Sequence, residues 1–178
     1  MAGSNGKTKM VRSMVLSMGV TLLAGGVMYL FTPHDEGEPD LPRVDYKIEL
    51  VTARRAAAYP VAAPEGLPQT WKATSVRFDG AENDAWHLGY RAPDGEYVQI
   101  EQAATGKRAE FLAEATQGAK ETKVTEEIGG RTWIRYADGR YDALVLDPAD
   151  SEKGATTVVA GTGTFEQLKQ MVRALRMA

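Results

Sequence analysis

The chain has 178 residues, of which 43% are hydrophobic and 25% are charged, and it contains 18 Gly, 8 Pro and no Cys. This length and mixture are typical of one folded domain with an appendage, and they exclude disordered and collagen-like chains. The absence of Cys excludes disulfide scaffolds, thiolate zinc sites, cysteine nucleophiles and an anchoring lipoprotein cysteine.

The net charge of −3 hides an uneven distribution along the chain. Lys7, Lys9 and Arg12 precede a long apolar run. The part of the chain beyond this run contains 18 basic and 24 acidic residues, so its net charge is −6. An acidic domain without a basic stripe is a poor binder of nucleic acid or of anionic lipid head groups. We therefore expect no nucleic-acid partner.

The apolar run over residues 13–31 contains 19 residues and no charge. As a helix it has a length of roughly 28 Å, close to the roughly 30 Å of a bilayer's hydrocarbon core. Basic residues precede it and acidic residues follow it, which by the positive-inside rule places the N-terminus in the cytoplasm. We predict a cytoplasmic tail over residues 1–12, a transmembrane helix over 13–31 in a single-pass protein of the cell membrane, and an extracytoplasmic remainder.

A cleaved signal peptide is the alternative to this anchor. Ala24 and Gly26 supply small residues of the kind that precede a cleavage site. The apolar run continues beyond them through Phe31, which favours an uncleaved signal anchor.

Small residues also recur at every fourth position of the run. Such a stripe lets two helices approach closely, so one expectation is a homodimer through this face. The alternative is that the spacing of the small residues is a coincidence, because such residues are common in membrane helices. The stripe consists of Ser13, Ser17, Thr21 and Gly25.

Residues 32–43 are rich in proline and acidic side chains and contain almost nothing apolar to bury. We predict an extended, solvated stalk over this segment. Residues 44–178 then supply enough chain for one core, and we assign them to a single extracytoplasmic domain.

The first part of this domain has mixed signals. Residues 44–51 alternate between apolar and polar side chains and predict a strand, and residues 52–59 favour a short helix. Residues 60–68 contain three prolines and are expected to be irregular. A strand is predicted over about residues 71–78.

A hairpin follows, with strands at residues 85–91 and 96–103 joined by an Ala-Pro-Asp-Gly turn. Residues 106–118 have apolar side chains at helical spacing and end in Gly118, where a left-handed cap is expected.

Three further strands are predicted as a meander at residues 123–128, 131–136 and 141–146, because Gly129-Gly130 and Asp138-Gly139 are strong hairpin signals. A loop over residues 147–154 leads to a last strand at 155–160, which is rich in Thr and Val.

Thr164 and Gln167 have the spacing of a capping box, which predicts the start of a final helix. Its apolar stripe is Phe165, Leu168, Met171, Val172 and Leu175, and Arg173 and Arg176 suit its C-terminal end. We therefore predict an α+β fold, with an antiparallel sheet of about five to seven strands packed with two amphipathic helices and preceded by one transmembrane helix.

Candidate catalytic groups are few. The extracytoplasmic segment contains only Ser75, Ser151 and His87 for a nucleophilic triad, and no G-x-S-x-G motif. Ser75 falls inside a predicted strand and Ser151 in an acidic loop. We interpret all three as ordinary polar residues, and His87 as a partly exposed structural histidine, with pH sensing as the weaker alternative.

Metal and phosphate motifs are equally weak. An imidazole site needs several histidines close together, but His34 lies in the predicted stalk and His87 is alone on its predicted strand. The acidic loop around Asp147 lacks calcium-loop spacing. Residues 161–163 resemble a phosphate-binding turn, but Glu166 occupies the third glycine position. We expect no metal, no cofactor and no catalytic residue.

Aromatic residues are numerous on the predicted strands, where they serve either as core or as the lining of an apolar or carbohydrate-binding surface. The residues that we select as candidates for such ligand binding are Trp71, Trp86, His87, Tyr90 and Trp133.

Several short motifs occur in a fixed order along the chain. They are Tyr59-Pro60, Pro-Glu-Gly-Leu-Pro at residues 64–68, Trp71, Trp-His-Leu-Gly-Tyr at 86–90, residues 98–102 and Val-Ala-Gly-Thr at 159–162. In this order they resemble a family of single-pass actinobacterial proteins known as domain of unknown function 4245. The resemblance covers the apolar run and nearly the whole domain, and it implies an envelope protein without assigning any activity, ligand or catalytic residue.

Together these features favour a non-enzymatic, membrane-anchored module that binds another envelope or membrane protein. A ligand- or glycan-binding module that uses the aromatic-rich sheet is the alternative. A hydrolase is the weakest of the three readings.

Overall fold

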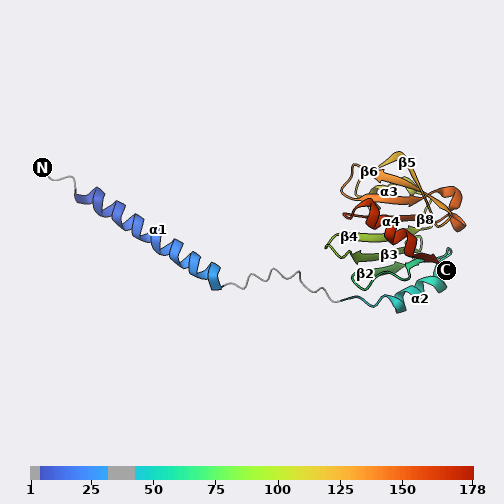
Figure 1. The fold of residues 1–178 in the computed structure, drawn as a ribbon, viewed down its shortest axis with the longest axis horizontal. Coiled ribbons are helices and arrows are strands. Elements are labelled where there is room, and N and C mark those ends of the chain that lie inside the picture. The colour runs from blue at the N-terminus through green and yellow to red at the C-terminus, as the bar shows by residue number, and fades with distance from the viewer. Residues whose placement is uncertain (1–4, 32–42) are drawn as a thin grey trace. The chain divides into compact units, whose positions relative to one another are not determined.

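The computed structural model describes residues 5–31 and 43–178. They belong to two compact units, a helix α1 (Asn5–Phe31) and a domain that ends at Ala178 (Figure 1). The predicted stalk lies outside the described residues except for Arg43.

Helix α1 is continuous over 27 residues and contains the whole predicted run 13–31. Within the described residues, no helix meets the length and hydropathy of a membrane span, so the crossing itself stays a prediction. Of the predicted small-residue stripe, the Thr21 hydroxyl donates to the Ser17 carbonyl at 3.0 Å and Gly25 has no neighbouring atom within 4 Å of an added Cβ. The Ser13 side chain is outside the described part.

The domain is built on a seven-stranded sheet in which all neighbouring strands are antiparallel. The strand order is β2-β3-β4-β8-β7-β6-β5, so β8 joins two three-stranded meanders. This confirms the α+β class and the upper limit of the predicted strand number. The strands are β2 (Lys72–Asp79), β3 (Ala85–Arg91), β4 (Tyr97–Ala103), β5 (Lys120–Ile128), β6 (Arg131–Ala137), β7 (Asp142–Leu146) and β8 (Thr156–Gly161).

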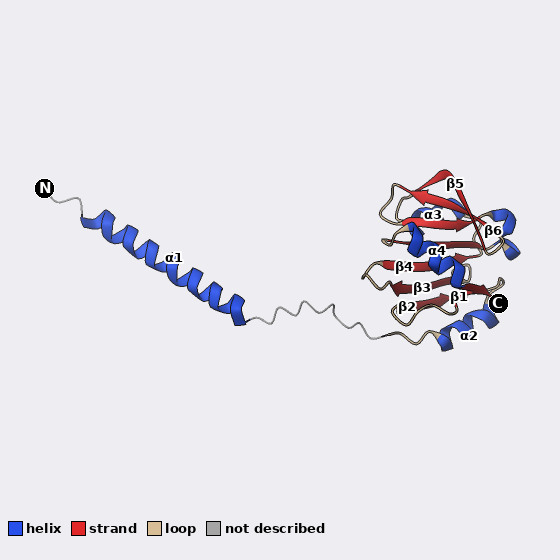
Figure 2. Cartoon of the chain, viewed as in Figure 1, coloured by secondary structure: helices blue, strands red, loops and turns tan. Residues whose placement is uncertain are grey.

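Helices cover the middle of this sheet on both faces (Figure 2). Successive residues of β7 alternate between two hydrophobic clusters, as the two-residue period of a strand requires. Leu144 belongs to the larger cluster with Leu168 and Met171 of α4 (Phe165–Ala174). Val145 belongs to the smaller cluster with Leu112 of α3 (Arg108–Ala115). Both predicted amphipathic helices are therefore confirmed, on opposite faces.

The predicted strand over residues 44–51 is wrong, because the chain forms helix α2 (Lys47–Ala56) there. Asp45 precedes the N-cap residue Tyr46 and accepts a hydrogen bond from the Lys47 amide at 3.1 Å, which forms a turn at the entry to the helix. Tyr46, Leu50 and the buried Ala53 pack against the core, and their spacing of four and three residues suits a helix. The apolar positions in this segment fit both the two-residue period of a strand and the period of a helix. The helix forms because its apolar side packs on the edge strand β2.

The predicted irregular segment 60–68 contains a short strand, β1 (Ala62–Pro64), that pairs antiparallel with β9 (Leu175–Met177). Two buried side chains hold β1 against the sheet. The Ala62 amide donates to Gln102 Oε1 at 2.6 Å, and the Trp86 indole donates to the Ala62 carbonyl at 2.9 Å. Strand β9 also ends the final helix at Ala174, so the last residue of the predicted apolar stripe, Leu175, lies in a strand.

The turn signals are confirmed. Gly129 and Gly130 have φ of 64° and 74°, and Asp138 has φ of 64°, the left-handed conformations that tight hairpins need. Thr164 and Gln167 form the predicted reciprocal capping box at the start of α4.

Candidate functional site

Three polar side chains converge where β2, β3 and β4 lie side by side. Ser75 is on β2, His87 on β3 and Glu101 on β4, and the register places His87 directly opposite Glu101. The same face of β4 carries Gln99, whose side-chain amide donates to the Ala115 carbonyl at the end of α3 at 2.9 Å. The cluster therefore lies on the face of the sheet that α3 covers, beside that helix.

The geometry of the cluster is a linear hydrogen-bond relay. Ser75 Oγ lies 2.8 Å from His87 Nε2, and His87 Nδ1 lies 2.7 Å from Glu101 Oε1. The side chains of His87 and Glu101 are 23% and 20% exposed. A neutral imidazole that donates from Nδ1 to the carboxylate presents Nε2 as an acceptor for the serine hydroxyl.

Tyr97 extends this relay at the serine end. A Cβ added to Gly89 would lie 2.3 Å from Ser75 Oγ and 2.5 Å from the Tyr97 hydroxyl oxygen, so the two hydroxyls meet above the glycine. Burial is the largest influence on the pKa of Tyr97 and raises it. The phenol remains protonated at neutral pH and is available as a donor. The Tyr97 ring also contacts Tyr141, with centroids 6.1 Å apart.

This convergence was missed by the sequence analysis, which treated Ser75 and His87 as separate polar residues and did not consider Glu101. The signal was present in the hairpin turn at residues 92–95. Pairing Arg91 with Tyr97 across that turn brings His87 opposite Glu101. The other candidate serine, Ser151, is not part of the cluster, because its hydroxyl donates to the Ala155 carbonyl.

The four aromatic residues of the predicted ligand-binding set lie in the core. Trp71, Trp86 and Trp133 are 3%, 0% and 2% exposed, and Tyr90 is 5% exposed. All four belong to the larger hydrophobic core. Alternation along β3 thus separates the predicted set, with Trp86 and Tyr90 in the core and His87 on the other face of the sheet. Of the five predicted ligand-binding residues, His87 alone lies in the polar cluster.

The weaker motifs have structural uses. In the acidic loop, Asp147 accepts from the Ala149 amide and Asp150 from the Thr132 amide. After β8, the Thr162 and Gly163 amides donate to the Tyr97 carbonyl at 2.9 and 3.4 Å, so they serve as a strand-to-helix turn. His34 is outside the described residues. Among those that are described, no group of three or more potential metal ligands comes together.

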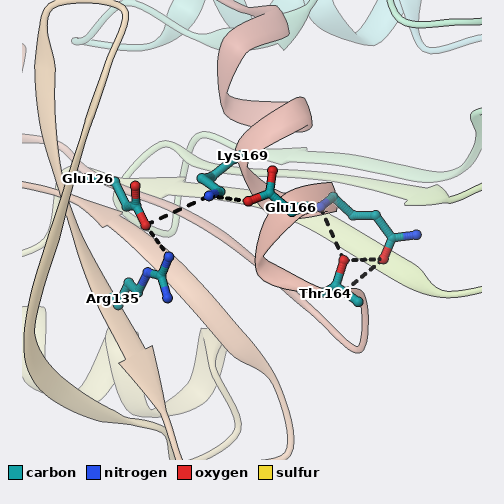
Figure 3. Close-up of polar contacts among 6 residues, drawn as sticks. Glu126, Arg135, Thr164, Glu166 and Lys169 are labelled. Carbon is teal, nitrogen blue, oxygen red and sulfur yellow. Dashed lines mark hydrogen bonds and ion pairs between the residues drawn. The ribbon is translucent and has the colours of Figure 1, made fainter.

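A second polar cluster, shown in Figure 3, joins α4 to the β5–β6 hairpin. Glu126 pairs with Arg135 and lies 3.9 Å from Lys169, which also pairs with Glu166. The Arg135 guanidinium stacks over the Phe165 ring at 4.4 Å. The hydrogen bond from Lys169 lowers the pKa of Glu166. Charges are matched within this cluster, so we interpret it as a structural clasp.

Fold and site together define a protein with a long N-terminal helix and one α+β domain that carries a Ser-His-Glu relay. A family model described as "Protein of unknown function (DUF4245)" matches residues 7–175, and the chain belongs to this family. Neither the curated proteins nor the solved structures that were compared with the chain gave a match.

Proposed function

We propose that this chain is a membrane-anchored module of the cell envelope, which displays its α+β domain outside the membrane and there binds another envelope or membrane protein. The proposal extends to the actinobacterial envelope that the family resemblance implied. The observation that carries it is the combination of an uncharged 19-residue run inside the continuous helix α1 with a single compact domain.

The charge distribution supports the orientation. Lys7, Lys9 and Arg12 lie before the run, and every acidic residue of the chain lies after it. A helix with this asymmetry inserts with its basic end in the cytoplasm. The domain then faces the outside, where its net negative charge keeps it soluble next to an anionic membrane.

The outer side of α2 is the surface that best suits a protein partner. Ile48 is 79% exposed and Val51 is 49% exposed, although both are large apolar residues. They are three residues apart and so share one face of the helix, and the exposed Lys47 and Arg55 flank them. An apolar stripe with basic edges suits an acidic amphipathic segment of a membrane protein.

Affinity isolation of the full-length chain from mild detergent tests this function. We expect a stoichiometric protein partner that is absent from a control chain of residues 1–43. The double variant Ile48→Glu/Val51→Glu is expected to lose the partner. Val124→Glu is the matched control, because Val124 is a 48% exposed apolar residue on β5 and its replacement should leave the partner bound.

Recovery of the full chain without any partner would contradict the proposal. Binding of the chain to protein-free vesicles through α2, lost in the double variant, would assign this face to lipid instead. The expectation that the domain is not an enzyme remains a prediction, and it rested partly on the apparent lack of a triad.

A further inference from the structure

We propose that Ser75 is a nucleophile that His87 activates as a general base. Glu101 is the positioning residue for the imidazole, and the Tyr97 hydroxyl donates a hydrogen bond to the substrate's carbonyl oxygen as it becomes an oxyanion. The substrate class is carboxylic esters. This activity is additional to partner binding and does not depend on it.

The atoms of the relay have the roles that the chemistry requires. A general base must lie within about 2.6–3.2 Å of the hydroxyl whose proton it takes, and a third group must fix its tautomer. The 2.8 Å contact from Ser75 Oγ reaches His87 Nε2, and the 2.7 Å contact of Nδ1 reaches Glu101. The two imidazole nitrogens therefore face opposite partners, and no flip of the ring is needed for proton transfer.

The backbone holds this relay rigidly. All three residues lie on paired strands of one sheet, with His87 opposite Glu101 and Ser75 opposite Gly89. Sites on strands are more precise than sites on loops, because the ladder fixes each Cα. Gly89 has a further use, since any side chain there would occupy the space of the Ser75 and Tyr97 hydroxyls.

The cluster is accessible to solvent. Ser75, His87, Tyr97 and Glu101 are all partly buried rather than enclosed in the core. The exposed Arg77 lies on the same side of β2, opposite His87. An ester is preferred over an amide because its alkoxide leaving group departs with less assistance from the general acid.

The reaction proceeds in two balanced halves. His87 Nε2 takes the hydroxyl proton as Ser75 Oγ bonds to the carbonyl carbon, and the Tyr97 hydroxyl donates to the resulting oxyanion. The intermediate then expels the alcohol, which receives the proton from His87, and leaves an acyl group on Ser75. Water attacks this acyl-serine with the same base, and the carboxylic acid is released.

Covalent labelling of the full-length chain in mild detergent is the direct test. An alkyl fluorophosphonate should phosphonylate Ser75 with loss of fluoride, detected by intact mass and peptide mapping. Ser75→Ala should abolish labelling, and the matched Ser151→Ala should not change it. His87→Gln should slow labelling by about 100-fold or more, the usual contribution of a general base.

The role of Glu101 is tested with p-nitrophenyl acetate. If Glu101 positions the imidazole, Glu101→Gln lowers kcat with little change in KM, and Glu101→Asp restores part of the rate. Tryptophan fluorescence of each variant checks that the domain remains folded, so a loss of rate is assigned to chemistry. An unlabelled Ser75 in the folded wild-type chain would overturn the proposal, as would equal labelling rates in His87→Gln and wild type. Either result would assign the cluster to sheet stability, without affecting the test of partner binding.

Discussion

Gly161 on β8 and Tyr97 on β4 lie in contact, so that a Cβ added to Gly161 would be 1.9 Å from the Tyr97 carbonyl oxygen. The same carbonyl accepts from the Thr162 amide at 2.9 Å, and the Tyr97 amide donates to Thr162 Oγ1 at 3.0 Å. The residue that anchors the end of β8 is thus the residue whose hydroxyl reaches Ser75.

We predict that Gly161→Ala destabilises the domain by about 1–3 kcal/mol, because the backbone must move to admit the methyl group. Urea unfolding of the full chain, followed by tryptophan fluorescence, measures this. All three tryptophans lie in the domain, so the signal reports on the domain alone. Gly106→Ala is the control, since no atom lies within 4 Å of its added Cβ. An unchanged stability in Gly161→Ala would refute the close approach.

Thr164→Ala should cost about 0.5–2 kcal/mol, because it removes the side chain that caps α4. The Gln167 amide loses the Thr164 hydroxyl as its acceptor, while the Gln167 side chain still accepts from the backbone amide of residue 164 and keeps its contacts with Asp94, both at 2.8 Å. Thr52→Ala, which removes a hydroxyl bonded to the Ile48 carbonyl within α2, should leave stability nearly unchanged. Equal losses in the two variants would show that the capping box contributes nothing specific.

Neutralising Glu126 should destabilise the domain by about 1–2 kcal/mol, because Arg135 and Lys169 would then lose their shared carboxylate. The Glu126 side chain is 22% exposed, so solvent screens it only in part. Glu110→Gln is the matched control. Its partner Lys107 is 75% exposed, and pairs of this kind contribute little. If high salt removed the whole stability difference between Glu126→Gln and wild type, the contribution of Glu126 would be that of a screened surface ion pair.

Stability should fall as the pH rises above about 10, the ordinary tyrosine pKa. Burial, together with a hydrogen bond to Glu121, raises the pKa of Tyr136 to about 12. The unfolded chain therefore loses the phenol proton while the folded domain retains it, which favours unfolding between these two values. Burial also raises the pKa of Tyr59 and Tyr90.

Tyr136→Phe should reduce this alkaline loss, although it also removes the 2.8 Å hydrogen bond to Glu121 and lowers stability at neutral pH. Urea unfolding at pH 8 and pH 11 separates the two effects. A wild-type domain that gained stability over this interval would be inconsistent with the tyrosine assignments.

Most of the sheet could be predicted from the sequence because its information is local. Glycines at residues 129 and 130 specify one hairpin, and Thr164 with Gln167 specifies the start of α4. Helix α2 could not be predicted in this way, since Tyr46, Leu50 and Ala53 fit a helix only once β2 is known to lie beneath them.

The polar cluster was missed for a different reason. His87 and Glu101 are related by the register of one hairpin, but Ser75 joins them through a second pairing that contains an irregularity between Ala73 and Ser75. Local signals do not fix such a shift. Likewise, β1 pairs with β9, which is near the other end of the domain's sequence. A proline-rich segment gives no local indication of such a strand.

The most direct test of the proposed display outside the membrane uses the natural absence of cysteine. Single-cysteine variants Ser4→Cys and Gly106→Cys are treated in intact cells with a membrane-impermeant maleimide. The account predicts that position 106 is labelled in intact cells and that position 4 is labelled only after lysis. Labelling of position 4 in intact cells, or protection of both positions until lysis, would contradict it.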